Sequence, residues 1–130
     1  MKFYIASSFK NIETVRRVAE ELKSRGFIHT YDWTEGRASS IAELEAIGSS
    51  EKNAVMEADI VMILLPAGKG SHVELGIALG TGKKVFLYSP DETVNDLELT
   101  STFYHLPEVE KVIGTVDELI QEICSQAAVS

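Results

Sequence analysis

The sequence of 130 residues has little cysteine, no long apolar run and, toward its end, almost no basic residues. Its single cysteine, Cys124, cannot form an internal disulfide or a cysteine-based zinc site, which excludes a disulfide-stapled secreted module. The longest apolar run, residues 60–66, is far shorter than the ~20 residues that span a bilayer. Residues 1–5 give way to serines too early for a signal peptide. These features predict a cytoplasmic protein that does not bind membranes.

The negative charge is concentrated near the C-terminus. Residues 1–90 carry 11 acidic and 11 basic side chains, whereas residues 91–130 carry nine acidic side chains and a single basic one, Lys111. An acidic segment of this kind repels a phosphate backbone, so a nucleic-acid polymer is not an expected partner. The balanced first 90 residues are compatible with a small anionic ligand.

Short apolar runs alternate with helical periodicity along the whole chain. A 45% apolar content and this length predict one domain over residues 1–130 with a substantial core. Strands are predicted over residues 3–6, 27–32, 60–65 and 85–88, with a weaker candidate at 111–113. Helices are predicted from residue 12 to a left-handed cap at Gly26, over 41–57 with a candidate break at Gly48, over 71–79, and at the C-terminal end.

This alternation predicts an α/β fold, a doubly wound parallel sheet of about five strands in a flavodoxin- or Rossmann-like three-layer sandwich. The strand at 27–32 is the more polar and is expected near an edge of the sheet. The uninterrupted apolarity of residues 60–65 is typical of a central strand that is buried on both faces.

Ligands of such sheets bind at the carboxyl ends of the strands, which here are followed by residues 6–10 and 66–74. In the second segment, Gly68 and Gly70 allow backbone amides to face a ligand, and Lys69 adds positive charge. A helix that starts at Ser71 points its positive end the same way. We therefore expect this segment to hold an oxyanion or a ribose hydroxyl.

Known nucleotide motifs do not fit this segment. A Walker loop fails because residue 63 is isoleucine and no Lys-Ser or Lys-Thr follows, and a dinucleotide fingerprint fails because Val73 replaces its third glycine. Kinase, ATPase and standard Rossmann dehydrogenase activities are therefore disfavoured. The three histidines lack metal-ligand spacing, and His72 is typical of a solvated side chain in a polar turn. No metal and no cofactor are predicted.

Glu74 has two interpretations. The pattern Ser71-x-x-Glu74 matches a capping box, in which the serine caps the helix and the glutamate bonds back to the serine amide. Alternatively, Glu74 is a carboxylate at a ligand cleft that attacks an electrophilic sugar carbon. The spacing alone does not choose between a structural and a chemical role.

Four blocks resemble the nucleoside 2-deoxyribosyltransferase family in order and spacing, over roughly residues 1–90. They are residues 3–9 (FYIASSF), 57–61 (EADIV), 70–78 (GSHVELGIA) and 82–85 (GKKV). The resemblance implies that Glu74 is the nucleophile that attacks the anomeric carbon of a nucleoside. It also implies that Tyr4 orients this carboxylate.

The same resemblance assigns further residues. Ser7 and Ser8 would line the sugar pocket, and Lys10, with Lys69 as a further candidate, would hold a 5′-phosphate. The aspartate that protonates the departing base in the family is replaced here by Glu51. An alternative is that Glu51, as a helix residue between Ser50 and Lys52, is a solvated surface carboxylate.

The segment that recognises the base in the family contains Asp32 and Trp33 in this chain. Trp33 offers a stacking face and Asp32 an acceptor, although an exposed loop tryptophan also suits a lid or an interface. The family further implies a homo-oligomer, a dimer or larger, in which Thr100, Ser101, Thr102 and Tyr104 are donated to a neighbouring subunit.

The sequence thus predicts an enzyme that cleaves or exchanges the N-glycosidic bond of a (deoxy)nucleoside or its 5′-monophosphate through Glu74. The positive helix end and Lys69 are expected to keep this carboxylate ionised near pH 7. Two alternatives remain: a glycosidase that acts on NAD, and a non-catalytic nucleotide sensor in which Glu74 only caps its helix or binds ribose hydroxyls.

Overall fold

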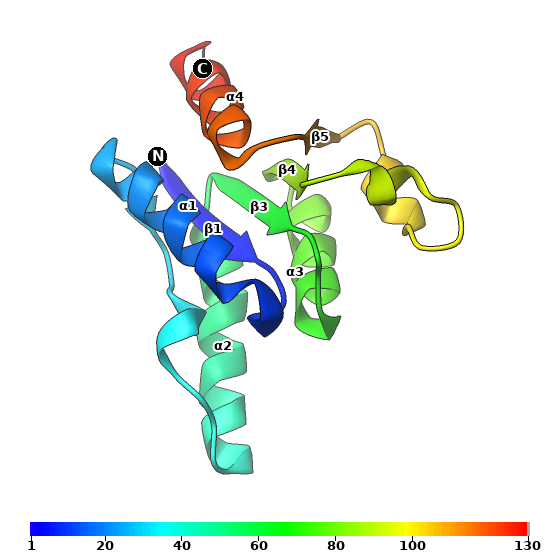
Figure 1. The fold of residues 1–130 in the computed structure, drawn as a ribbon. Coiled ribbons are helices and arrows are strands. Elements are labelled where there is room, and N and C mark those ends of the chain that lie inside the picture. Colours follow the sequence, from blue (N-terminus) through cyan, green and yellow to red (C-terminus); the bar gives the residue numbers. More distant parts are fainter. Residues whose placement is uncertain (130) are drawn as a thin grey trace.

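A five-stranded parallel sheet lies at the centre of the computed structural model, which describes residues 1–129. The sheet has the order β2-β1-β3-β4-β5 (Figure 1). The strands are β1 (Lys2–Ala6), β2 (Ile28–His29), β3 (Ile60–Leu64), β4 (Lys84–Ser89) and β5 (Val109–Ile113). All strands are parallel, and β2 is added on one side of β1 whereas β3, β4 and β5 follow on its other side, so the topological switch point lies between β1 and β3.

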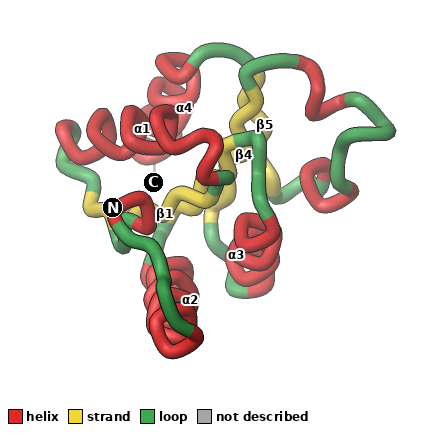
Figure 2. The backbone as a smooth tube through the Cα atoms, turned by 60° about the horizontal axis from the view of Figure 1, so that its bottom comes forward, coloured by secondary structure: helices red, strands yellow, loops and turns green. Residues whose placement is uncertain are grey.

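Two pairs of helices cover the two faces of the sheet, as Figure 2 shows. One pair is α1 (Ile12–Ser24) with α4 (Val116–Val129), and the other is α2 (Ile41–Glu57) with α3 (Lys69–Gly80). Short 3-10 helices occur at η1 (Phe9–Asn11), η2 (Trp33–Glu35), η3 (Glu92–Asn95) and η4 (Thr102–His105). This architecture confirms the predicted three-layer, doubly wound α/β fold.

The apolar run at β3 forms the middle of the core. All five β3 side chains are buried, and the strand is bonded to β1 on one side and to β4 on the other. The predicted central position of this strand is therefore confirmed, as is the edge position of β2. Burial of apolar side chains at about 25 cal/mol per Å² is the main stabilising contribution here.

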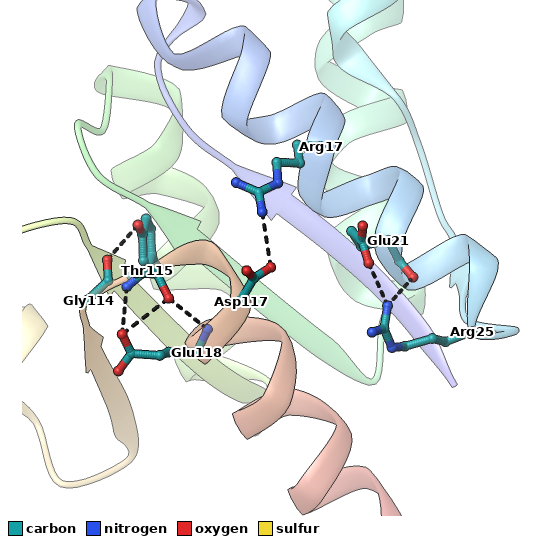
Figure 3. Close-up of polar contacts among 8 residues, drawn as sticks. Arg17, Glu21, Arg25, Gly114, Thr115, Asp117 and Glu118 are labelled. Atoms are coloured by element: carbon teal, nitrogen blue, oxygen red, sulfur yellow. Dashed lines mark hydrogen bonds and ion pairs between the residues drawn. The ribbon is translucent and has the colours of Figure 1, made fainter.

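Helix α1 packs through the apolar stripe that its sequence predicts. Its buried residues are Val15, Val18, Ala19 and Leu22, and the chain then turns at Gly26 with φ +88°. Arg17 of α1 contacts Asp117 of α4 at 3.0 Å (Figure 3). Both side chains are exposed, so this ion pair contributes at most about 1 kcal/mol, and apolar packing holds the layer.

Helix α2 begins at a serine cap and runs without interruption. The Ser40 hydroxyl accepts a hydrogen bond from the Glu43 amide (3.1 Å), while the Glu43 carboxylate accepts one from the Ser39 amide (2.6 Å). The candidate break at Gly48 is not observed, because helical hydrogen bonding continues through it to Glu57. The first half of α2 extends beyond the sheet (Figure 1), and only its last part is buried, at Ala54 and Val55.

Other predicted bounds differ by a few residues. Helix α3 starts at Lys69 rather than at residue 71, and β5 starts at Val109 rather than at residue 111. In the described part of the chain, no helix has both the length and the apolarity to cross a membrane.

The uninterrupted course of α2 predicts the effect of Gly48→Ala. Gly48 is exposed, and a Cβ added there meets nothing within 4 Å. Alanine in a helix interior is favoured over glycine by roughly 0.5–1 kcal/mol, so we expect the free energy of unfolding to rise by about that amount in urea titrations. Gly82→Ala is the control and should destabilise, since Gly82 has φ +72°. A destabilised Gly48→Ala variant would indicate that α2 is broken at this position.

Candidate functional site

The carboxyl ends of β1 and β3 are bound together by the serines that follow β1. The Ser7 hydroxyl donates to the Leu64 carbonyl at 2.7 Å, and the Ser8 amide donates to the Pro66 carbonyl at 3.1 Å. The Asn11 side-chain amide donates to the Ser7 hydroxyl at 3.1 Å. Asn11 was not singled out by the sequence, because its role depends on the pairing of two strands far apart in the chain.

Tyr4 and Glu74 meet beneath this edge of the sheet. The Tyr4 hydroxyl donates to the Glu74 carboxylate at 2.5 Å. Tyr4 is fully buried, and Glu74 is only 8% exposed. The bond links strand β1 to α3, so it holds the Glu74 carboxylate in one place.

The capping-box interpretation of Glu74 is wrong. Helix α3 is capped by Gly68, and Ser71 lies inside the first turn, where its hydroxyl accepts a hydrogen bond from the Gly68 amide at 3.0 Å. Because the cap lies three residues earlier than the capping box predicts, at Gly68 and not at Ser71, Glu74 is about one turn further along the helix. Its carboxylate bonds to Tyr4 and not to a helix amide.

The side chain of Glu51, on α2, lies next to Tyr4 and Glu74. Helices α2 and α3 pack side by side, which brings the half-buried Glu51 side chain within hydrogen-bonding reach of both partners. The alternative of a solvated surface carboxylate is therefore wrong. We refer to Glu51 and Glu74 as the carboxylate pair.

The carboxylate pair carries raised pKa values. The pKa of Glu74 is raised to about 8, chiefly by burial and also by the nearby Glu51, while the hydrogen bond from Tyr4 acts in the opposite direction. Burial also raises the pKa of Glu51, whereas hydrogen bonds to Glu74 and Tyr4 lower it. The pKa of Tyr4 is raised as well, mainly by burial and in addition by the charge of Glu74. Two neighbouring carboxyl groups in a buried place do not ionise together, so near neutral pH the pair shares a proton.

The expectation that Lys69 and the helix end keep Glu74 ionised is therefore wrong. Lys69 is exposed in the first turn of α3, and the pKa of Glu74 is governed by burial, Tyr4 and Glu51. The donated Tyr4 hydrogen bond is the interaction that favours the ionised form of Glu74.

The glycine turn lies beside the serine turn. A Cβ added at Gly68 would lie 3.9 Å from the Ser8 backbone. Lys69 and Gly70 are exposed at the start of α3, and Lys10 is exposed in η1. The structure thus brings the two predicted ligand-binding segments together at the switch point, with exposed lysines in both.

Asp32 and Trp33 are used within the fold. The Trp33 indole is 7% exposed, and its N–H donates to the Ile5 carbonyl at 2.6 Å, so the alternative of an exposed lid or interface tryptophan is wrong. The Asp32 carboxylate accepts from the Thr34 amide (2.9 Å) and hydroxyl (2.6 Å). Asp32 thus caps η2, and Trp33 bonds η2 to β1.

On the other side of the glycine turn, His72 is exposed, as the sequence predicts, and it is also hydrogen-bonded within the chain. Its Nδ1 lies 2.9 Å from the Gly68 carbonyl, and its Nε2 lies 2.7 Å from the Tyr104 hydroxyl. Thr100, Ser101 and Tyr104 line a cavity together with His72 of the same chain, and Thr102 is exposed at the start of η4. Within residues 1–129, no three metal-binding side chains are grouped in a way that could hold an ion.

The chain belongs to the nucleoside 2-deoxyribosyltransferase family, whose model matches residues 3–117. This is a family of enzymes that transfer or cleave N-glycosidic bonds. None of the curated proteins matches the chain in sequence.

Solved structures that share the fold include the following two. The CMP N-glycosidase BcmB of Clostridium botulinum superimposes with a TM-score of 0.64 at 15% identity, over 95% of this chain and 99% of its own. A conserved protein from Enterococcus faecalis V583 gives a TM-score of 0.64 at 14% identity, over 97% of this chain and 98% of its own.

The raised pKa of Glu74 predicts the stability of Glu74→Gln. A carboxyl whose pKa is higher in the folded than in the unfolded state stabilises the fold below pH ~4.5, and this contribution is lost as pH rises toward 8. Glutamine does not titrate, and its carbonyl can still accept from Tyr4. We therefore expect the melting temperature of the variant, relative to wild type, to be higher at pH 8 than at pH 5.

Glu45→Gln, an exposed position on α2, serves as the matched control and should show no such pH-dependent difference. A capping role predicts a different outcome. In that case Glu74→Gln would lose about 1 kcal/mol of stability at both pH values.

Proposed function

We propose that this protein cleaves or exchanges the N-glycosidic bond of a (deoxy)nucleoside or its 5′-monophosphate, with Glu74 as the nucleophile. The observation that carries the proposal is the buried Glu74 carboxylate, hydrogen-bonded to Tyr4 and adjacent to Glu51. Membership of the nucleoside 2-deoxyribosyltransferase family supports the reaction class. The shared fold with a CMP N-glycosidase is consistent with a nucleotide substrate.

In the first step, the ionised Glu74 carboxylate attacks the anomeric carbon and forms a glycosyl ester. The C–N bond breaks, and its electron pair leaves with the base. The proton that the carboxylate pair shares, which the raised pKa of Glu74 places on Glu74 in the free protein, passes to Glu51 when the substrate is bound, and Glu51 gives it to the departing base. The carboxylate beneath the sugar also stabilises the positive charge that builds on the ring in the transition state.

In the second step, an acceptor base or a water molecule attacks the anomeric carbon, and the ester bond to Glu74 breaks. Glu51, now ionised, takes the proton of the attacking group, which restores the starting state. Attack by a base gives transfer, and attack by water gives hydrolysis. Because burial raises the pKa of Glu51, it can hold a proton at a pH where a solvated glutamate is ionised.

We propose that the rest of the substrate binds at the serine turn and the glycine turn, which lie side by side at the switch point. Ser7, Ser8 and the segment 68–71 would contact the sugar, while Lys10 or Lys69 would contact a 5′-phosphate. We also propose that Asp32 and Trp33 lie next to the base. Because the Trp33 N–H and the Asp32 carboxylate are already bonded within the fold, the contact with the base would be made by the remaining surface of η2.

We also propose a cytoplasmic homo-oligomer, a dimer or larger, in which the segment 100–104 contacts a neighbouring subunit. Exposed apolar side chains are consistent with an association surface, and they include Ile41 and Leu44 on α2 and Phe103 on η4.

The proposal predicts loss of turnover in the carboxylate variants. Purified protein is incubated with a panel of nucleosides, their 5′-monophosphates and NAD, with and without a free acceptor base, and the products are separated by chromatography. Glu74→Gln should reduce turnover below detection, because the amide is not a nucleophile. Glu51→Gln should reduce it by roughly 10²- to 10⁴-fold, the usual contribution of a general acid.

Glu45→Gln, exposed on the same helix as Glu51, is the control and should retain wild-type turnover. A new nucleoside formed only with acceptor indicates a transferase, and free base alone indicates a hydrolase. Nicotinamide release from NAD alone would support the NAD glycosidase instead. Unchanged turnover in Glu74→Gln, or no turnover of any substrate by the folded wild type, contradicts the proposal.

A further inference from the structure

A cavity of about 550 Å³ lies at the carboxyl ends of β3 and β4. It is bounded on one side by the turn that leads from β3 into α3 and on the other by the segment from β4 to η4, which projects from the sheet in Figure 1 (yellow to gold). The serine turn, Tyr4 and the carboxylate pair do not belong to its lining. The cavity is thus separated from Glu74 by the β3–α3 turn.

One wall of the cavity is fixed by His72 and Tyr104. The His72 Nδ1 faces the Gly68 carbonyl, which only accepts hydrogen bonds, so Nδ1 carries the proton. In the neutral ring, Nε2 then accepts from the Tyr104 hydroxyl. The two rings are stacked with centroids 5.7 Å apart, and Tyr104 is buried. The two sides of the cavity are therefore joined by a contact within the chain itself.

The chemistry of the lining favours a ligand that donates hydrogen bonds. Asp91 has a pKa below its usual range, because the Thr93 hydroxyl and amide donate to it, so its carboxylate is ionised and accepts hydrogen bonds. Thr100 and Ser101 contribute hydroxyls, and apolar walls come from Leu65, Pro66, Val94 and Leu99. Among the described residues that line the cavity there is no lysine or arginine, so a phosphate group has no cation to pair with.

We propose that this cavity is a second binding position, for a neutral, amino-substituted heterocycle of nucleobase to nucleoside size. The volume lies in the range typical of small-molecule sites. The flat ring contacts the apolar wall that includes Leu99, and the exocyclic amino group donates to Asp91. The choice of nucleobases as probes rests on the proposed function, whereas the site itself does not involve Glu74.

The test is a titration of the protein with adenine and with purine, which lacks the amino group, followed by calorimetry or ligand-observed NMR. Asp91→Asn should weaken adenine binding about tenfold, the loss expected for a hydrogen bond to a charged group, while asparagine still caps η3. Leu99→Ala should also weaken binding. Leu97→Ala is the matched control, since Leu97 is exposed on the same segment and does not line the cavity.

Adenine binding that is tighter than purine binding, reduced by Asp91→Asn and Leu99→Ala and unchanged in Leu97→Ala and Glu74→Gln, supports the proposal. Failure of adenine to bind at millimolar concentration, equal binding of purine, or equal effects of Leu97→Ala and Leu99→Ala overturns it. Loss of binding in Glu74→Gln also overturns it, because the base would then lie at the carboxylate pair. Intact adenine binding without turnover would contradict only the proposed function.

Discussion

The hydrogen bond between Tyr4 and Glu74 is the interaction on which the arrangement of the site depends. It connects β1 to α3, the helix that follows β3, and both side chains are buried. A buried carboxyl group is costly unless it is protonated or hydrogen-bonded, and two adjacent ones are costlier. Here the Tyr4 donor and a shared proton reduce that cost. The apolar core around β3 stabilises the fold and offsets the remaining free-energy cost of burying the two carboxyl groups.

The same constraint links the fold to the proposed chemistry. A nucleophile and a proton donor need opposite protonation states at one pH, and a pair of carboxyl groups with raised pKa values provides both from two glutamates. The hydrogen bond from Tyr4 favours the ionised form of Glu74, whereas burial and the neighbouring Glu51 oppose it. Because Tyr4, Glu51 and Glu74 come from β1, α2 and α3, the pair exists only when these three elements have packed together.

The sequence was sufficient for the architecture because the signals are local. The apolar run of β3 and the serine cap of α2 determine each element within a few residues, and the predicted bounds of α2 agree with the structure. The start of α3 was misplaced because Ser71-x-x-Glu74 matches a capping box, and the earlier cap is Gly68, which has no side chain to signal it.

The environment of the candidate residues could not be predicted in the same way. Whether Glu51 is solvated depends on how α2 packs against α3, and a single helix does not reveal this. Likewise, Trp33 follows a short edge strand in a polar loop, yet its indole is bonded to the Ile5 carbonyl beneath η2. The partners of His72 lie four and 32 residues away, and the second of them depends on the fold of η4.

The central claim is that Glu74 forms a covalent bond to the sugar, and the mass of the protein during turnover tests it most directly. The enzyme is quenched in acid while it turns over the best substrate of the panel, digested with protease and mapped by mass spectrometry. We expect the mass of the glycosyl group on the peptide that contains Glu74, and no adduct in Glu74→Gln. An adduct on a different residue, or full turnover by Glu74→Gln, would contradict the account.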